Sequence, residues 1–152
     1  MDFARGLGIR GKRDGYLEND RYIITWAVGH LVELYEPQDY NPAWKKWSFE
    51  NLPVIPDTYR YKPIKKTAKQ LTIIRKLLSE KNIAKIVVAT DAGREGEVIA
   101  RTVLSAARPG KMIKIYLLWT SQALTPALVK RQMNSLNPAT ANDIIMDACR
   151  AR

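Results

Sequence analysis

The sequence predicts an α/β fold built around parallel strands. An apolar, β-branched run over residues 83–90 ends at an acid, which is typical of a strand buried in a parallel sheet. Apolar residues then recur at helical spacing from Glu95 to about Ala106, and a second apolar run covers residues 112–119. A strand, a helix and a strand in this order predict two parallel strands joined by a crossover helix.

The N-terminal part of the chain predicts a hairpin followed by an irregular segment. Residues 16–28 alternate as two short strands with a turn at Asn19-Asp20. Residues 36–66 contain five prolines interleaved with aromatic and basic residues, so we expect an irregular segment held by its aromatics.

Three further helices are expected from capping signals and periodicity. Thr67 and Gln70 have the spacing of a capping box, and apolar residues follow at helical spacing over 68–78. Thr125-Pro126 predicts a helix through about residue 136. Asn137-Pro138 predicts the start of a last helix that runs to the end of the chain.

Composition limits the class of protein. The 152 residues are the size of one domain, and a hydrophobic content of 46% is enough for a core. No apolar run approaches the roughly 20 residues of a membrane span, and the N-terminus lacks the apolar stretch of a signal peptide. The single cysteine, Cys149, excludes an intrachain disulfide and a cysteine-based zinc site. We therefore expect a cytoplasmic protein that does not associate with membranes.

The charge of the chain indicates a polyanionic partner. The net charge is +10, and nine basic residues and one acid lie between Tyr59 and Lys85. Tyr59 and Tyr61 lie among these bases, as phosphate contacts combined with base stacking would require. A solvated helix face is the simpler interpretation of the later bases. The candidates for DNA contacts are the four that precede the helix: Arg60, Lys62, Lys65 and Lys66.

An acidic cluster follows the first parallel strand. Asp91 closes that strand, and Glu95 and Glu97 lie at the start of the following helix. Ligands of open α/β sheets bind at the carboxyl ends of the strands, and neighbouring carboxylates there favour a cation such as Mg²⁺. The simpler alternative is a helix N-terminus with Asp91 as N-cap and acids that complement the helix dipole.

The same residues resemble a known family. Residues 89–97, Ala-Thr-Asp-Ala-Gly-Arg-Glu-Gly-Glu, resemble the acidic motif of the Toprim domain as type IA DNA topoisomerases carry it. The flanking segments resemble the topoisomerase III branch in order and spacing, and they cover residues 15–18, 24–31, 47–56, 65–70 and 118–121.

The resemblance implies a Toprim (Rossmann-like) fold over residues 1–152, with a central, mainly parallel sheet flanked by helices. It also implies Mg²⁺ held by Asp91 and Glu95, with single-stranded DNA passing nearby. In the family, a tyrosine of another domain cleaves a DNA strand, and the Toprim acids and Mg²⁺ support cleavage and religation. The expected partners are therefore single-stranded DNA and the remaining domains of a bacterial, nucleoid-associated topoisomerase.

Three departures from the family pattern qualify these expectations. The family has Asp-x-Asp-x-Glu, and Gly93 replaces the second acid, which puts a second Mg²⁺ in doubt. The Glu-Lys-Pro-Ser strand that opens the family domain and the catalytic-tyrosine domain have no match here. We therefore expect an N-terminally truncated fragment that does not relax DNA alone. Exposed sheet edges also lead us to expect that it either self-associates or is only marginally stable.

Several individual residues receive expected roles. Arg94 is expected to contact phosphate or to order the acids, with a purely structural ion pair as the alternative. Gly93 and Gly96 are expected to permit tight turning. The remaining candidates for DNA contacts are His30, Thr120 and Ser121. Two other functions remain open: the Toprim domain of a primase or nuclease, and a DNA-binding module that neither catalyses nor needs metal.

Overall fold

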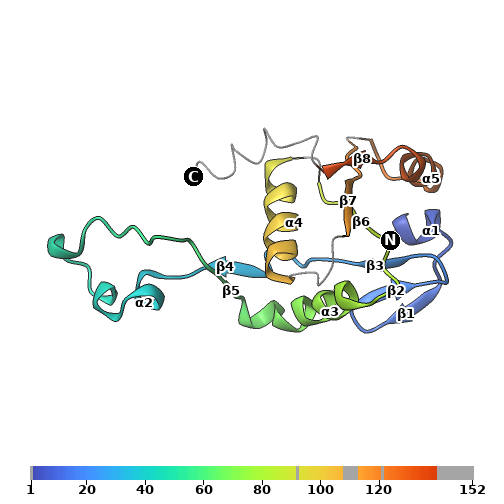
Figure 1. Cartoon of the computed structure of the whole chain (residues 1–152). Helices are drawn as coiled ribbons and strands as arrows, with labels where there is room; N and C mark the ends of the chain where they lie inside the picture. The colour runs from blue at the N-terminus through green and yellow to red at the C-terminus, as the bar shows by residue number, and fades with distance from the viewer. Residues whose placement is uncertain (1, 92, 108–112, 121, 140–152) are drawn as a thin grey trace.

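A computed structural model describes residues 2–91, 93–107, 113–120 and 122–139 (Figure 1). The helices are α1 (Asp2–Gly6), α2 (Pro37–Tyr40), α3 (Ala68–Ser79), α4 (Arg94–Ala107) and α5 (Pro126–Asn134), with short 3₁₀ turns η1 (Pro42–Lys45), η2 (Phe49–Asn51) and η3 (Lys65–Thr67). The strands are β1 (Gly11–Arg13), β2 (Tyr16–Glu18), β3 (Ile23–Thr25), β4 (Val32–Leu34), β5 (Tyr61–Pro63), β6 (Lys85–Val88), β7 (Lys114–Leu117) and β8 (Asn137–Pro138). Within these ranges, no helix is both long and apolar enough to cross a membrane.

The predicted strand–helix–strand unit is confirmed. Strands β6 and β7 are parallel, in a register that runs from Lys85 opposite Lys114 to Val88 opposite Leu117. Helix α4 connects them, and the Leu118 amide extends the pairing by donating to the Val88 carbonyl oxygen at 2.8 Å. The carboxyl ends of both strands therefore meet at one edge of the sheet.

The expectation of a central, mainly parallel sheet is not met by the described residues. They form three small sheets, β1-β2-β3, β4-β5 and β6-β7-β8, and β6-β7 is the only parallel pair among them. The apolar patterns identified strands but not their partners, because pairing depends on contacts between distant segments.

The helix predicted to begin at Asn137-Pro138 is also wrong at its start. These two residues form β8, which pairs antiparallel with Tyr116 and Leu117 of β7. Proline is tolerated there because an edge strand leaves one side of its backbone without ladder hydrogen bonds. The rest of the predicted helix, residues 140–152, lies outside the described residues.

The predicted hairpin is confirmed, with strands shorter than expected. Strands β2 and β3 pair antiparallel, with Tyr16 opposite Thr25, and β1 adds a third strand. The side-chain oxygen of Asn19 accepts hydrogen bonds from the amides of Arg21 and Tyr22, at 3.0 and 2.8 Å. Asparagine closes the turn because its side chain replaces a backbone acceptor.

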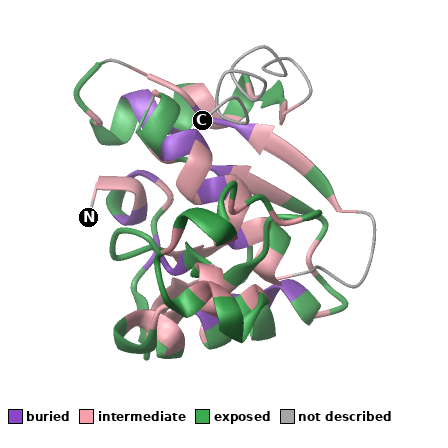
Figure 2. Cartoon of the chain, turned by 90° about the vertical axis from the view of Figure 1, so that its left-hand side faces the viewer, coloured by how far each residue is buried: buried purple, intermediate pink, exposed green. Residues whose placement is uncertain are grey.

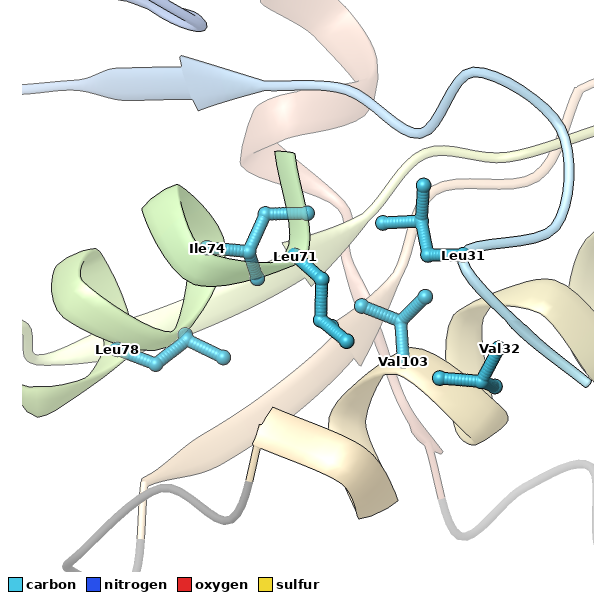
Figure 3. Close-up of a cluster of buried hydrophobic side chains, with 6 residues drawn as sticks. All are labelled: Leu31, Val32, Leu71, Ile74, Leu78 and Val103. Carbon is cyan, nitrogen blue, oxygen red and sulfur yellow. The ribbon is translucent and has the colours of Figure 1, made fainter. Parts of the chain in front are cut away.

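The main core joins three segments that are far apart in the sequence. Leu31 and Val32 at the start of β4 pack with α3 and with Val103 of α4 (Figure 3). The α3 contribution is Leu71, Ile74 and Leu78, which confirms the apolar periodicity predicted for this helix. This packing places the residue before Leu31, which is His30, close to α4.

The capping box predicted for α3 is wrong. The side chain of its N-cap, Thr67, donates to the carbonyl oxygen of His30 at 3.4 Å and does not cap the helix. Gln70 Nε2 instead reaches the hairpin, where it donates to the carbonyl oxygens of Gly15 and Trp26, both at 2.9 Å. Gln70 therefore forms tertiary hydrogen bonds in place of the local hydrogen bond of a capping box.

Helix α5 begins as predicted. Thr125 caps it, because its hydroxyl oxygen accepts a hydrogen bond from the Leu128 amide at 3.2 Å. The helix packs on α1, where a Cβ added at Gly6 would lie 2.8 Å from Val129 Cβ. Only glycine allows this close approach.

Residues 35–60 form a projection that we call the arm. Strands β4 and β5 pair antiparallel at its base, with Val32 opposite Pro63 and Leu34 opposite Tyr61. The arm extends away from the body of the molecule (Figure 1). No residue between Val32 and Leu71 is buried, so the arm has no core of its own (Figure 2).

Candidate metal and DNA site

The acidic motif turns from β6 into α4 within a few residues. The Gly93 amide donates to the Asp91 carbonyl oxygen at 2.8 Å, and the Glu97 amide donates to the Gly93 carbonyl oxygen at 3.1 Å. Asp91 and Glu95 are both exposed here, at the carboxyl edge of the parallel pair. The two predicted metal ligands therefore face solvent on a short, hydrogen-bonded turn.

The two glycines of the motif have different surroundings. A Cβ at Gly96 would lie 2.3 Å from the Asp91 carbonyl oxygen, so the first turn of α4 packs directly on the backbone of Asp91. A Cβ at Gly93 would meet no atom within 4 Å. Gly96 is therefore required by close packing, whereas Gly93 occupies an open position where a side chain would fit.

His30 contacts the acidic motif. Its Nε2 donates to Glu95 Oε1 at 2.6 Å, and the side chains of His30 and Glu95 are 46% and 74% exposed. An ionised carboxylate only accepts hydrogen bonds, so the proton belongs to the imidazole. The sequence predicted His30 and Glu95 as separate contacts, and the structure brings them together.

The surrounding backbone holds His30 in this position. The Ile64 amide donates to the Leu31 carbonyl oxygen at 3.0 Å, which places η3 beside the His30 corner. Lys65 and Lys66 lie on η3 and are exposed. Two predicted phosphate contacts therefore lie close to the segment that carries His30.

Glu97 is separated from the other acids by burial. Its side chain is 1% exposed and pairs with Arg101 Nε at 2.5 Å, one helical turn further along α4. It lines a small cavity with apolar residues that include Val88, Ala100 and Leu117. Glu97 is therefore a buried residue that forms an ion pair within α4, and it is not exposed to solvent as Asp91 and Glu95 are. Its spacing of four residues from Arg101 is a sequence signal that could have identified this pair.

The other predicted DNA-contacting residues lie in two places. Arg94 is exposed at the first residue of α4, and Thr120 follows β7 at the same sheet edge as Asp91. The Thr120 hydroxyl oxygen accepts a hydrogen bond from the Gln122 amide at 3.1 Å. Arg60 is exposed at the base of the arm. Ser121 lies outside the described residues.

Lys62 is held by an ion pair at the base of the arm. Its Nζ donates to Asp39 Oδ2 at 2.6 Å. The hydrogen bond from Lys62, with one from the Glu36 amide, lowers the pKa of Asp39. The same contact raises the pKa of Lys62. Any phosphate bound by Lys62 would compete with this carboxylate.

The donor set fits an open Mg²⁺ site rather than a closed one. Among the described residues, no three His, Cys, Asp or Glu side chains are grouped to hold a metal. Asp91 and Glu95 supply two exposed carboxylates on one turn. Because Mg²⁺ is commonly held by one or two carboxylates together with substrate phosphates and water, this pair suits a site that a DNA phosphate completes.

Comparison with known proteins agrees with the sequence motif. The model of the Toprim domain matches residues 4–118. DNA topoisomerase 3 of Staphylococcus haemolyticus is 42% identical over 127 residues, which are 84% of this chain and 18% of the relative. The enzyme of Staphylococcus epidermidis is 40% identical over 151 residues, 99% of this chain and 21% of the relative. That of Bacillus anthracis is 42% identical over 151 residues, 99% of this chain and 20% of the relative. The chain thus spans about a fifth of the length of these relatives.

Proposed function

Because the chain belongs to the Toprim domain family, we propose that it is the Toprim domain of a bacterial type IA DNA topoisomerase of the topoisomerase III kind. In this role it binds Mg²⁺ and single-stranded DNA in the bacterial cytoplasm. It supports strand cleavage and religation by a tyrosine on another domain of the same enzyme.

The contact between His30 and Glu95 carries the proposal. Asp91 and Glu95 are the proposed Mg²⁺ ligands, and His30 leaves one oxygen of Glu95 for the metal while orienting the carboxylate. Carboxylates that bind metals are usually held by such hydrogen bonds. When bound, Mg²⁺ would stabilise charge on the phosphate and on the leaving oxygen. Arg94 is proposed to help orient the acids or the phosphate.

The DNA path is proposed to run from the base of the arm to the acidic turn. Lys65 and Lys66 on η3 lie between these points and are exposed. Basic side chains along such a path would bind the phosphates of a single strand. The full set of proposed contacts is His30, Arg60, Lys62, Lys65, Lys66, Arg94, Thr120 and Ser121.

Calorimetric titration with Mg²⁺, with and without a single-stranded oligonucleotide, tests the proposal. We expect Mg²⁺ to bind more tightly when the oligonucleotide is present, because its phosphate completes the site. Asp91→Asn should abolish this tighter Mg²⁺ binding. Asp57→Asn, which alters an exposed acid of the arm, should leave it intact. Equal Mg²⁺ affinity for Asp91→Asn and the unaltered chain would contradict the proposed metal site.

A DNA-binding module that works without metal is the second candidate. It is favoured by Gly93, which stands at the family's second acid, and by the lack of a group of three metal-binding side chains in the described part of the chain. Oligonucleotide binding that is the same with Mg²⁺ and with a chelator would support this candidate.

A further inference from the structure

Large apolar side chains at the tip of the arm, residues 47–55, are exposed to solvent. The Phe49 side chain is 95% exposed and that of Trp47 is 79% exposed, and Leu52 and Ile55 are exposed beside them in the sequence. While it faces water, each such side chain forgoes the favourable free energy that its burial would provide. Several large apolar side chains that are exposed this close together in the sequence are typical of an interaction site.

The arm nevertheless has a defined shape. Asn51 Nδ2 donates to the carbonyl oxygens of Ala43 and Lys46, at 3.2 and 3.1 Å, and so joins η1 to η2. At the base, the Arg60 amide donates to the hydroxyl oxygen of Tyr40 at 2.7 Å. Hydrogen bonds therefore present the apolar side chains on a preformed segment.

The charge of the arm indicates a protein partner rather than DNA. The arm has three basic and four acidic residues, although the whole chain has a net charge of +10. Residues 47–59 contain no Lys, Arg or His and two acids, Glu50 and Asp57. Proteins that bind single strands combine stacking aromatics with a positively charged groove, and residues 47–59 supply no basic side chain to such a groove. Aromatic side chains at the centre of a patch with few charges are instead typical of protein interfaces.

We propose that the arm tip, defined by Trp47, Phe49, Leu52 and Ile55, docks on an apolar surface of another domain of the same polypeptide. This inference rests on the proposed function. The relatives match nearly all of this chain with only about a fifth of their own length, so about four fifths of each relative lies outside the shared region. A domain tethered to the arm reaches it at a high effective concentration.

Hydrogen–deuterium exchange tests the docking surface. The 152-residue chain is compared with a polypeptide extended to the length of the relatives, and exchange is followed in peptides from the arm. We expect the arm tip to exchange at least about tenfold more slowly in the longer polypeptide, because docking shields its amides. Phe49→Asp should restore fast exchange there. The matched control, Val28→Asp, alters an exposed apolar residue outside the arm and should leave the protection unchanged.

Three outcomes would overturn the docking proposal. Equal exchange in both polypeptides would show that nothing covers the arm. Protection of the 152-residue chain that grows with its concentration would identify a second copy as the partner. Protection of that chain by a single-stranded oligonucleotide would identify DNA. Mg²⁺-dependent DNA relaxation by the longer polypeptide is measured in parallel. Relaxation with an unprotected arm would refute the docking alone, and a protected arm without relaxation would refute the proposed function.

Discussion

His30 Nε2 lies 2.6 Å from Glu95 Oε1, although the two residues are 65 positions apart in the sequence. The contact joins the corner before β4 to the first turn of α4, and the packing of Leu31 against Val103 holds these two segments together. His30 is the only histidine in the sequence, and this contact places its imidazole beside one oxygen of the Glu95 carboxylate.

Removing the His30 donor should weaken metal binding. We expect His30→Leu to lower the Mg²⁺ affinity of the complex with oligonucleotide by about tenfold, because loss of a hydrogen-bonding partner commonly costs a metal site 10- to 100-fold in affinity. His30→Gln keeps an N–H donor and should recover part of the loss. Calorimetric titration measures both variants. If His30→Leu binds Mg²⁺ as tightly as the unaltered chain, His30 does not position Glu95.

The two glycines of the motif should respond oppositely to alanine. Gly96→Ala would place a methyl group 2.3 Å from the Asp91 carbonyl oxygen and should destabilise the chain by about 1–3 kcal/mol. Gly93→Ala meets no atom within 4 Å and should change stability by no more than about 1 kcal/mol. Chemical denaturation compares the two variants directly. Similar losses for both would show that the turn does not pack on Asp91 as described.

Restoring the family's second acid should strengthen the metal site. A side chain at Gly93 has open space around its Cβ, so Gly93→Asp should fold normally. A third carboxylate raises the negative charge of the site, and we expect Mg²⁺ to bind about tenfold more tightly. Gly93→Asn has nearly the same size without the charge and serves as the control. Equal Mg²⁺ affinity for the two variants would mean that position 93 does not face the metal.

The ion pair between Asp39 and Lys62 should make the base of the arm sensitive to pH. The folded state lowers the pKa of Asp39, so its contribution to stability is present above the usual aspartate value of about 3.9. It is lost as the pH falls through the lowered value. The folded state raises the pKa of Lys62, so its contribution is present below about 10.4. It is lost as the pH rises through the raised value.

NMR titration of the Asp39 carboxyl carbon and the Lys62 Nζ protons measures these two limits. Asp57→Asn leaves the pair in place and should not shift either titration. Asp39→Asn should return the pKa of Lys62 toward its usual value. A normal pKa for Asp39 in the unaltered chain would show that the pair does not form in solution.

Local features of the fold were largely predictable from the sequence. The distant segments and side chains that they contact were not. The apolar spacing of α3 and the Thr125 cap of α5 were identified correctly, because each depends on neighbours within a few positions. Gln70 fitted a local capping box but binds the hairpin instead. A side chain with several donors is used where the folded chain brings it closest to acceptors, and the spacing of residues does not reveal that place.

The family, the strand–helix–strand unit and the acidic turn between its first strand and its helix could all be predicted from the sequence. These features follow from hydrophobic periodicity and from a motif that is continuous along the chain. Tertiary packing determined which of the acids are exposed and which is buried. It left Asp91 and Glu95 exposed, and it buried Glu97 against Arg101. It also brought His30 to Glu95 and turned Asn137-Pro138 into a strand, because such contacts arise only when distant segments pack together.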